Sequence, residues 1–385
     1  MHAALRALGV VGLVSAFSIG GMLVPIDQAE AAGQDNVFPG AWLSSNDGDV
    51  QELLEGREGY CLGFSGALVS LAGFDDDGDG LVDEDPFNGA DDDLDGLIDE
   101  DTADFGSRPR IYMTHGFSET SGDSDDVRVY DIEADVWLDP APAIPSGNPR
   151  SEGVGVSHGG LTYCLGGRFA GVLDTVEAYD PTANAWSALA SMPTARAGLA
   201  AATKGSRIYT FGGRDGTTAC TGTIQDVAEV YDIPSDVWVS VTPPPIPVTD
   251  ATAIAHGGRI YLIGGCSATE PELSRTDAVQ IYDPQGDTWS DGATMPTARH
   301  NLALGILGDT IYAIGGDADE NLDVVEAYDI DKDEWTVDIA AKPNATSENY
   351  GISHGGKIYV PGSGIFGAAE SFFDVFMRKN KGPSS

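Results

Sequence analysis

Two acidic segments near the N-terminus have the residue types and the spacing of metal-binding loops. The first, DDDGDGLVDED, begins at Asp75, and the second, DDDLDGLIDED, begins at Asp91. Aspartates stand at positions 1, 3, 5 and 9, with glycine at 6 and an apolar residue at 8. Calcium prefers such carboxylate and main-chain carbonyl oxygens in a flexible loop. The candidate ligands, with the two leucines acting through their carbonyl oxygens, are Asp75, Asp77, Asp79, Leu81, Asp83, Asp85, Asp91, Asp93, Asp95, Leu97, Asp99 and Asp101.

The two loops depart from an EF-hand at position 12, where Pro86 and Thr102 stand in place of a bidentate glutamate. They resemble instead the tandem Asp-rich calcium repeats of extracellular proteins, in which late acidic residues close the site or bridge two ions. The late residues here are Glu84, Asp85, Glu100 and Asp101. A disordered acidic linker is the alternative, but repeated odd-position spacing favours two calcium ions.

Four arginines form a second candidate site. Each precedes a turn glycine by nine residues, at the start of a short apolar segment. Because guanidinium groups bind carboxylates through paired hydrogen bonds, a cluster of arginines could hold a carboxylate ligand. The alternative is that each arginine bonds carbonyl or carboxylate groups of the adjacent structural unit. The four residues are Arg57, Arg150, Arg196 and Arg299.

The elements that must position these residues follow an internal repeat of 46 to 52 residues. Five times, an apolar segment ending in a glycine pair or its remnant precedes a Tyr-Asp pair, with Trp seven residues after the Tyr. A sixth copy has Phe373-Asp374 in place of Tyr-Asp and lacks its tryptophan. The five pairs are Tyr130/Trp137, Tyr179/Trp186, Tyr231/Trp238, Tyr282/Trp289 and Tyr328/Trp335.

This pattern resembles the kelch repeat, and the resemblance covers nearly all of the chain outside the signal and the acidic insert. Its glycine pairs are Gly166-Gly167, Gly212-Gly213, Gly264-Gly265 and Gly315-Gly316. The resemblance implies an all-β, six-bladed β-propeller of four-stranded blades. One repeat cannot bury its apolar face alone, so neighbouring blades must pack together, with Tyr and Trp between them. Trp42 supplies the missing tryptophan, so the strand around residues 41–44 is expected to close the last blade and cover its edge.

The expected organisation has five regions. Residues 1–31 form a signal peptide, with an apolar run and the small residues Ala29 and Ala31 at an A-x-A site; an uncleaved membrane anchor is the alternative. Residues 32–56 are the N-terminal closing segment, 57–378 the six-bladed propeller, 67–109 the acidic insert within blade one, and 379–385 a polar tail. The expected location is secreted, periplasmic or at the cell surface.

The chain has 61 acidic and 20 basic residues, a net charge of −41. Such a surface has no basic patch to neutralise phosphates, which argues against nucleic acid and anionic membrane as partners. We expect no membrane insertion after signal cleavage, and the oligomeric state stays open.

The four cysteines, Cys61, Cys164, Cys220 and Cys266, are an even number in an exported chain. Their overall connectivity stays open. Cys220 and Cys266 both follow glycine pairs in adjacent blades, so a bridge between their loops is one of the pairings that stay open.

Two kinds of kelch enzyme offer precedents. Galactose-oxidase-like enzymes hold copper through His and Tyr, but His158, His256 and His354 fall in HGG turns expected on the opposite face from the arginines. His115 replaces a glycine of the pair, and His300 follows an arginine. Exported sialic acid mutarotases are also kelch propellers with Arg and acidic residues around the channel, yet no Glu or His is assigned here to acid–base work.

These features favour a non-enzymatic, calcium-stabilised kelch propeller that binds an extracellular protein or glycan. The alternative is an exported sugar-acid mutarotase using the channel-mouth arginines, so enzymatic activity stays an open question. The functional expectation depends on the family resemblance, because a fold alone does not fix function.

Overall fold

The protein is described by a computed structural model, and every regular element in its described residues is a β-strand. No described segment is an apolar helix long enough to cross a membrane. The described residues are 16–19, 22–25, 41–44, 61–65, 109–118, 122–123, 127–132, 136–138, 149–216, 220, 222–269, 272–343, 345–347, 350–361 and 373–377. Within them, β1 (Ala16–Ile19) and β2 (Met22–Pro25) form a hairpin inside the apolar N-terminal segment.

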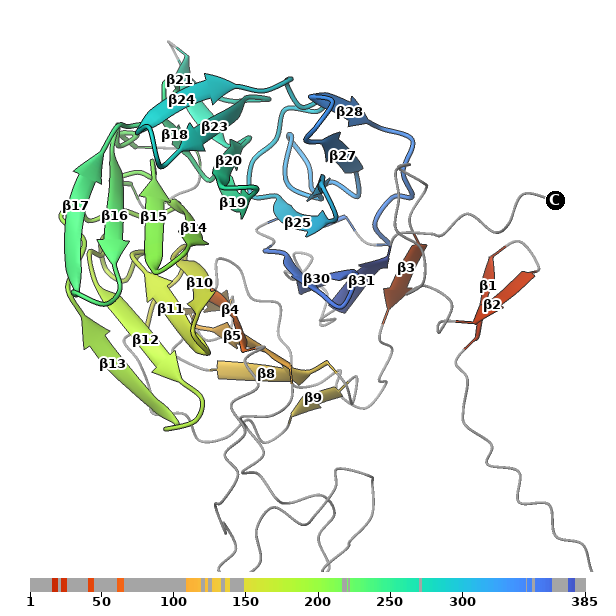
Figure 1. Ribbon diagram of the computed structural model, residues 1–385, viewed down its shortest axis with the longest axis horizontal. Helices are drawn as coiled ribbons and strands as arrows, with labels where there is room; N and C mark the ends of the chain where they lie inside the picture. The colour runs from red at the N-terminus through yellow and green to blue at the C-terminus, as the bar shows by residue number, and fades with distance from the viewer. Residues whose placement is uncertain are drawn as a thin grey trace, which may run out of the picture.

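Six four-stranded antiparallel sheets make up most of the described chain, and Figure 1 shows them arranged around a common centre. The first contains β4 (Cys61–Ser65), β5 (Arg110–Thr114), β8 (Val127–Asp131) and β9 (Val136–Leu138). The second contains β10 (Val154–His158), β11 (Leu161–Leu165), β12 (Val176–Asp180) and β13 (Ala185–Leu189). The third contains β14 (Ala200–Lys204), β15 (Arg207–Phe211), β16 (Ala228–Asp232) and β17 (Val237–Val241).

The other three sheets repeat this order from the inner strand outward. The fourth contains β19 (Thr252–His256), β20 (Arg259–Ile263), β23 (Val279–Asp283) and β24 (Thr288–Asp291). The fifth contains β25 (Ala303–Leu307), β26 (Thr310–Ile314), β27 (Val325–Asp329) and β28 (Glu334–Thr336). The sixth contains β29 (Ile352–His354), β30 (Lys357–Pro361), β31 (Phe373–Met377) and, from the N-terminal side, β3 (Ala41–Ser44).

The repeat seen in the sequence sets the register within each sheet. In five sheets the Tyr of the third strand lies directly opposite the Trp of the outer strand, as in the pair Tyr231 and Trp238. The glycine pairs end the second strands with left-handed backbone, for example φ 58° at Gly212 and 95° at Gly213. A Cβ on Gly212 would lie 1.9 Å from the carbonyl oxygen of Val248, so this turn excludes a side chain.

The core lies between the sheets rather than within one of them. Tyr231 and Trp238 of the third sheet pack on Val176 and Ala178 of the second. Equivalent clusters join the third sheet to the fourth and the fourth to the fifth. The predicted role of these aromatics as packing between units is confirmed for these sheets.

In the third, fourth and fifth sheets an aspartate five residues after the Tyr adds a polar latch to this packing. The Tyr231 hydroxyl donates to Asp236 at 2.6 Å, and the same carboxylate oxygen accepts the Ala190 N–H of the preceding sheet at 2.8 Å. The indole N–H of Trp238 donates to the Ala190 carbonyl at 2.8 Å. The same latch recurs at Asp287 and Asp333.

The sixth sheet joins an N-terminal strand to the last strand of the described chain. Strand β3 pairs antiparallel with β31, with Trp42 opposite Phe376. The sixth sheet also reaches the first, since the rings of Tyr359 and Tyr130 are 6.5 Å apart.

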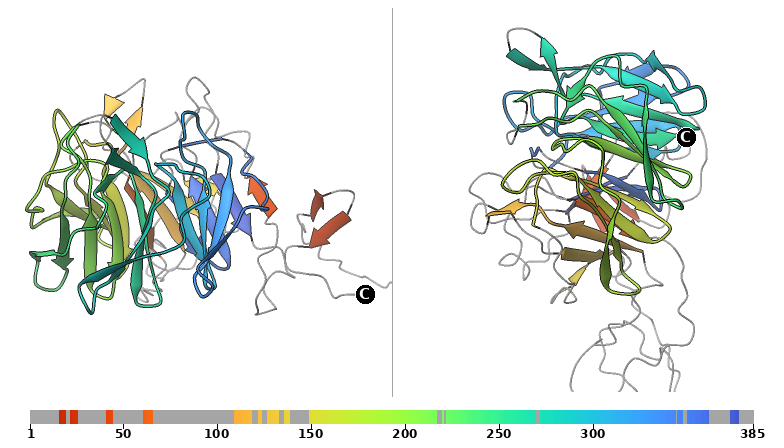
Figure 2. Two further views of the ribbon diagram at one scale, coloured as in Figure 1. Left: turned by 90° about the horizontal axis from the view of Figure 1, so that it is seen from above. Right: turned by 90° about the vertical axis from the view of Figure 1, so that its left-hand side faces the viewer.

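Two further hairpins extend the loops that follow the glycine pairs. These are β6 (Phe117–Ser118) with β7 (Gly122–Asp123), and β21 (Cys266–Thr269) with β22 (Glu272–Arg275), the latter also pairing with β18 (Val248–Thr249). Both side views in Figure 2 show the two hairpins projecting from the same face. We call this the loop face.

Candidate binding face at the mouth of the channel

The predicted calcium ligands and one predicted arginine lie outside the described residues. This applies to every candidate ligand from Asp75 to Asp101 and to Arg57. The calcium sites therefore stay a prediction.

The other three predicted arginines are fully buried, each paired with a glutamate of its own sheet. The guanidinium of Arg196 lies 2.8 Å from Glu229, and that of Arg299 lies 2.5 Å from Glu326. Arg150 pairs in the same way with Glu177. Each also donates to main-chain carbonyls of its own sheet, such as Gly212 for Arg196. This favours the structural alternative over ligand binding, although the partners come from the same sheet rather than from the next one.

Burial and ion pairing act in opposite directions on these guanidinium groups. Burial lowers the pKa of Arg196 to about 10, against the opposing effect of Glu229. It also lowers the pKa of Arg150 and of Arg299, each partly offset by its glutamate. A group with a pKa near 10 stays charged at neutral pH, so Arg196 and Glu229 form a buried ion pair.

The sequence reasoning missed the glutamates, although a signal was present. Glu177, Glu229 and Glu326 each stand two residues before the Tyr of the repeat. In the fourth sheet Val248 occupies the arginine position, and Gln280 occupies the glutamate position. The Gln280 amide bonds both the N–H and the carbonyl of Ile246. In the fourth sheet, Val248 and Gln280 thus take the place of the charged arginine and glutamate, and both are uncharged.

A chain of main-chain hydrogen bonds links the inner-strand starts of four sheets on the loop face. The linked residues stand two positions after the arginine position and have left-handed backbone, with φ between 52° and 60°. Gly198 N–H donates to Glu152 at 3.0 Å, Asp250 N–H to Gly198 at 2.7 Å, and Asn301 N–H to Asp250 at 2.9 Å. We call this hydrogen-bonded chain of Glu152, Gly198, Asp250 and Asn301 the rim.

A cavity of about 270 Å³ lies among the inner strands. Its described lining is aliphatic and hydroxylic, with alanines such as Ala202 and Ala253, and holds no Asp, Glu, His, Lys or Arg. The Tyr350 hydroxyl donates to the carbonyl of Gly153 at 3.0 Å, joining segments 197 residues apart.

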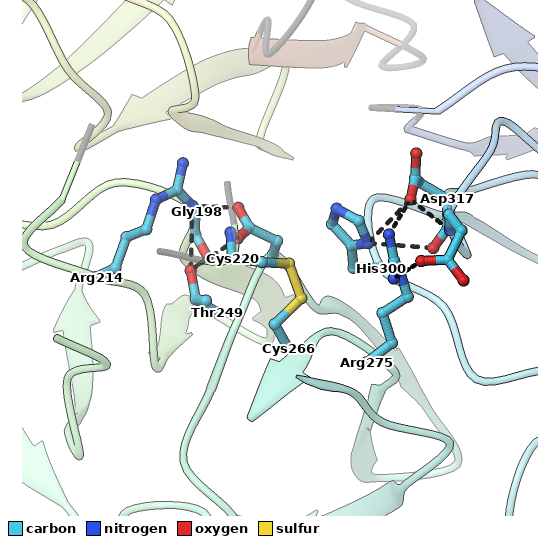
Figure 3. Close-up of a disulfide and its surroundings, with 10 residues drawn as sticks. Gly198, Arg214, Cys220, Thr249, Cys266, Arg275, His300 and Asp317 are labelled. Carbon is cyan, nitrogen blue, oxygen red and sulfur yellow. Dashed lines mark hydrogen bonds and ion pairs between the residues drawn. A yellow bond between two sulfur atoms is a disulfide. The ribbon is translucent and has the colours of Figure 1, made fainter. Parts of the chain in front are cut away.

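Arg214, directly after a glycine pair, crosses the rim over Gly198 (Figure 3). Its side chain is fully buried between Glu152 and Asp250, and it donates to Thr249 at 3.1 Å. A Cβ on Gly198 would overlap the guanidinium, so a side chain at this position would require Arg214 to move. Burial raises the pKa of Glu152, an effect that Arg214 and then Arg168 oppose. The sequence reasoning did not identify this network.

The structure contains the bridge between Cys220 and Cys266, and it lies beside this network (Figure 3). The Cys220 N–H donates to the Asp250 carboxylate at 2.9 Å. The bridge therefore ties the loops of the third and fourth sheets to the rim. Cys164 is disulfide-bonded as well.

Ionic and aromatic groups of the loop face reach solvent beyond the rim. Arg275 bridges Asp317 and Asp319, at 2.7 Å to each. Phe169, two residues after a glycine pair, has 48% of its surface exposed.

The histidines of the HGG turns end inner strands β10, β19 and β29. His256 contacts Asp309 of the next sheet at 2.7 Å. The left-handed residues of these turns are the glycines, whereas His115 does adopt positive φ in its glycine position.

Comparisons with known proteins point to kelch repeats. Residues 190–363 match the family model described as KLHDC2/KLHL20/DRC7 Kelch-repeats domain, and residues 149–193 match the Kelch motif. The chain is 26% identical over 231 residues to Kelch repeat and BTB domain-containing protein 1 of cowpox virus. It is 28% identical over 235 residues to mouse Kelch-like protein 23.

These matches cover 59% and 60% of this chain but only 40% and 39% of the relatives. Among solved structures, that of YjhT aligns with a TM-score of 0.58 at 16% identity, over 69% of this chain and 90% of that one. The structural likeness at this identity shows the fold alone. Together the matches support a kelch-repeat family, and kelch repeats generally mediate protein–protein interaction.

Proposed function

We propose that this protein is a secreted, calcium-binding, six-bladed kelch propeller whose loop face recognises an extracellular protein or glycan. The observation that carries the recognition function is the construction of the loop face. A hydrogen-bonded rim, a buried Arg214 and a disulfide hold loops that present Phe169 and Arg275 to solvent. Binding groups on loops held by a rigid scaffold are typical of recognition modules.

Six blades are supported by the six four-stranded sheets, with β3 completing the sixth. Each sheet carries one copy of the repeat, and aromatic clusters join neighbouring sheets. A closed circle of blades leaves only short, protected edges.

Export is supported by the A-x-A signal pattern and by the disulfides, which persist in oxidising compartments. Calcium is supported by the two Asp-rich loops, because carboxylates this dense repel each other without cations.

The mutarotase alternative is not favoured. Arg150, Arg196 and Arg299 are paired inside their own sheets. The described lining of the channel offers no carboxylate or imidazole for acid–base work.

Binding by the mature protein can be tested on a glycan array and an array of extracellular proteins. Replacing Phe169 by Ser is expected to reduce binding at least tenfold, because an exposed aromatic anchor contributes strongly to interfaces. Val337→Ser is the matched control, since Val337 is 61% exposed and follows outer strand β28. Equal losses in both variants, or no specific binding to either array, would refute recognition through the loop face.

A further inference from the structure

Three potential metal ligands meet on the loop face apart from the acidic insert. The sulfur atoms of Cys220 and Cys266 and a ring nitrogen of His300 all lie within 4.8 Å of one another. Cys266 and His300 are buried and Cys220 is half-buried. Figure 3 shows His300 and the disulfide side by side, between Arg214 and Arg275.

The hydrogen bonds of His300 fix which ring nitrogen carries a free lone pair. Nδ1 lies 3.1 Å from the Asp317 carbonyl oxygen, which can only accept, so Nδ1 carries the proton. The Nε2 lone pair is therefore available. Metal-binding histidines have this same arrangement, in which the second nitrogen donates to a carbonyl and orients the ring.

The protein scaffold holds the three groups from separate sheets. Cys266 pairs in register with Thr249, the residue before Asp250. The Asp250 carboxylate accepts the Cys220 N–H, and its carbonyl accepts the Asn301 N–H directly after His300. A single residue thus connects the backbone around all three ligands, and this connection does not depend on the disulfide bond.

We infer that reduction of the Cys220–Cys266 disulfide creates a site for a thiophilic divalent cation of the zinc class. A dithiol reductant supplies two electrons and two protons, breaking the S–S bond to give two thiols while the reductant becomes a disulfide. The cation then displaces both thiol protons and binds two thiolates and the His300 imidazole. In a tetrahedral zinc site, ligand atoms lie roughly 3.4–3.8 Å apart at the usual Zn–S and Zn–N bond lengths. The observed spacing accommodates this after the sulfurs separate.

The ligand set makes this site different in kind from the proposed calcium loops. Thiolate and imidazole select soft or borderline ions, whereas carboxylate loops select calcium. Both Asp250 oxygens are already bonded, to Arg214 and to Cys220 N–H. Three protein ligands leave a fourth position for water or an exogenous ligand. The inference is independent of the proposed recognition function.

Cobalt is a suitable probe because thiolate ligands give it a characteristic charge-transfer absorption. The mature full chain is reduced with dithiothreitol, freed of the reductant under argon and titrated with Co²⁺ in excess calcium, which occupies oxygen-ligand sites. We expect one equivalent to bind with the sulfur-to-cobalt band, zinc to displace it, and the unreduced protein to show no band. A reduced protein without this band would overturn the inference.

Substitutions test whether the cobalt band comes from Cys220, Cys266 and His300 rather than from Cys164. Cys220→Ser/Cys266→Ser should abolish it, and His300→Gln should weaken Co²⁺ binding at least tenfold. The matched control, His158→Gln in a turn of the opposite face, should bind as the wild type does. A band that survives the double substitution, or an affinity unchanged in His300→Gln, contradicts the site. If the variants do not fold, alkylation of the reduced wild type with and without zinc tests the site instead. Zinc should protect Cys220 and Cys266 from alkylation, and the absence of protection would refute the proposed site.

Discussion

The second, third and fifth sheets each bury an arginine and a glutamate together. In the fourth sheet, uncharged residues stand at both positions. Isolated buried charges are strongly unfavourable, whereas a paired and fully hydrogen-bonded set is tolerated. Arg196 and Glu229 are paired and have main-chain and hydroxyl partners, although Arg196 Nε is buried without a hydrogen-bond partner. Val248 and Gln280 fill the same positions without charge. The fourth sheet therefore changes both positions together, whereas the first sheet has Arg57 and Arg128 there.

We expect Arg196→Val to lower the free energy of unfolding by about 3–5 kcal/mol, because Glu229 is left buried without its partner. Arg196→Val with Glu229→Gln copies the fourth sheet and should recover at least half of that loss. Urea unfolding followed by tryptophan fluorescence measures both. A double variant as unstable as the single one would contradict coupling of the two positions.

Gly198 makes room for Arg214, and a turn glycine provides a matched comparison. Gly198 has φ 60° with the guanidinium 2.1 Å from a hypothetical Cβ, while Gly205 has φ 59° and open space. Both Ala variants bear the same backbone strain, but only Gly198→Ala displaces Arg214. We expect it to be at least ~2 kcal/mol less stable than Gly205→Ala. Equal thermal stability would show that Arg214 moves without loss.

The latch aspartates predict acid sensitivity. Hydrogen bonds from Tyr231 and the Ala190 N–H lower the pKa of Asp236, and those from Tyr328 and the Ala293 N–H lower that of Asp333. A lowered folded-state pKa gives stability above the unfolded value, near 3.9, that is lost as pH falls through the folded value. The temperature of the unfolding midpoint should therefore decrease as the pH is lowered below about 4.

The Asp236→Asn/Asp333→Asn variant should make the unfolding midpoint depend less on pH. It should keep the fold, because in the second sheet Asn184 already accepts the Tyr179 hydroxyl at 3.0 Å. Midpoints measured from pH 3 to 6 for wild type and variant provide the comparison. An unchanged acid slope would place the sensitivity elsewhere among the carboxylates.

At the scale of elements, the loops after the glycine pairs differ most between sheets. The loops of the third and fourth sheets carry the Cys220–Cys266 bridge, and strand β21 extends the fourth with its own hairpin. The sheets themselves keep one strand order and one Tyr–Trp register. Variation is therefore concentrated on the loop face.

Cys220→Ser/Cys266→Ser should lower the free energy of unfolding by about 2–4 kcal/mol, as expected for a bridge that closes a long loop. The four-stranded sheets should persist, since their hydrogen bonds do not involve the bridge. Thermal unfolding with circular dichroism tests both statements. Loss of the β-sheet spectrum at 25 °C would instead make the bridge a requirement for folding.

At the scale of the whole molecule, the main feature is the large net negative charge. A net charge of −41 disfavours compactness through self-repulsion, and cations that bind the folded chain offset it. Fifteen of the 61 acidic residues lie between Asp75 and Asp104, in the insert.

We expect the mature wild type to bind two calcium ions by titration calorimetry, and calcium to protect residues 67–109 from proteolysis. Asp77→Asn/Asp93→Asn removes one ligand from each loop and should weaken binding at least tenfold, because oxygen charge sets calcium affinity. Magnesium serves as the control and should protect poorly, since it demands stricter geometry. Equal protection by both ions would indicate charge screening alone.

The repeat spacing by itself determined the all-β class and the aromatic packing between sheets, because these depend on periodicity. The sequence offered Cys220–Cys266 as one pairing, and the tertiary structure decided it. The tertiary structure decided the role of the arginines. The sequence places Arg196 at the start of an inner strand, but only folding brings Glu229 from the third strand beside it. Likewise Arg214, Glu152 and Asp250 come from three different sheets. The first contact depends on strand pairing within one sheet, and the second depends on how neighbouring sheets pack against each other.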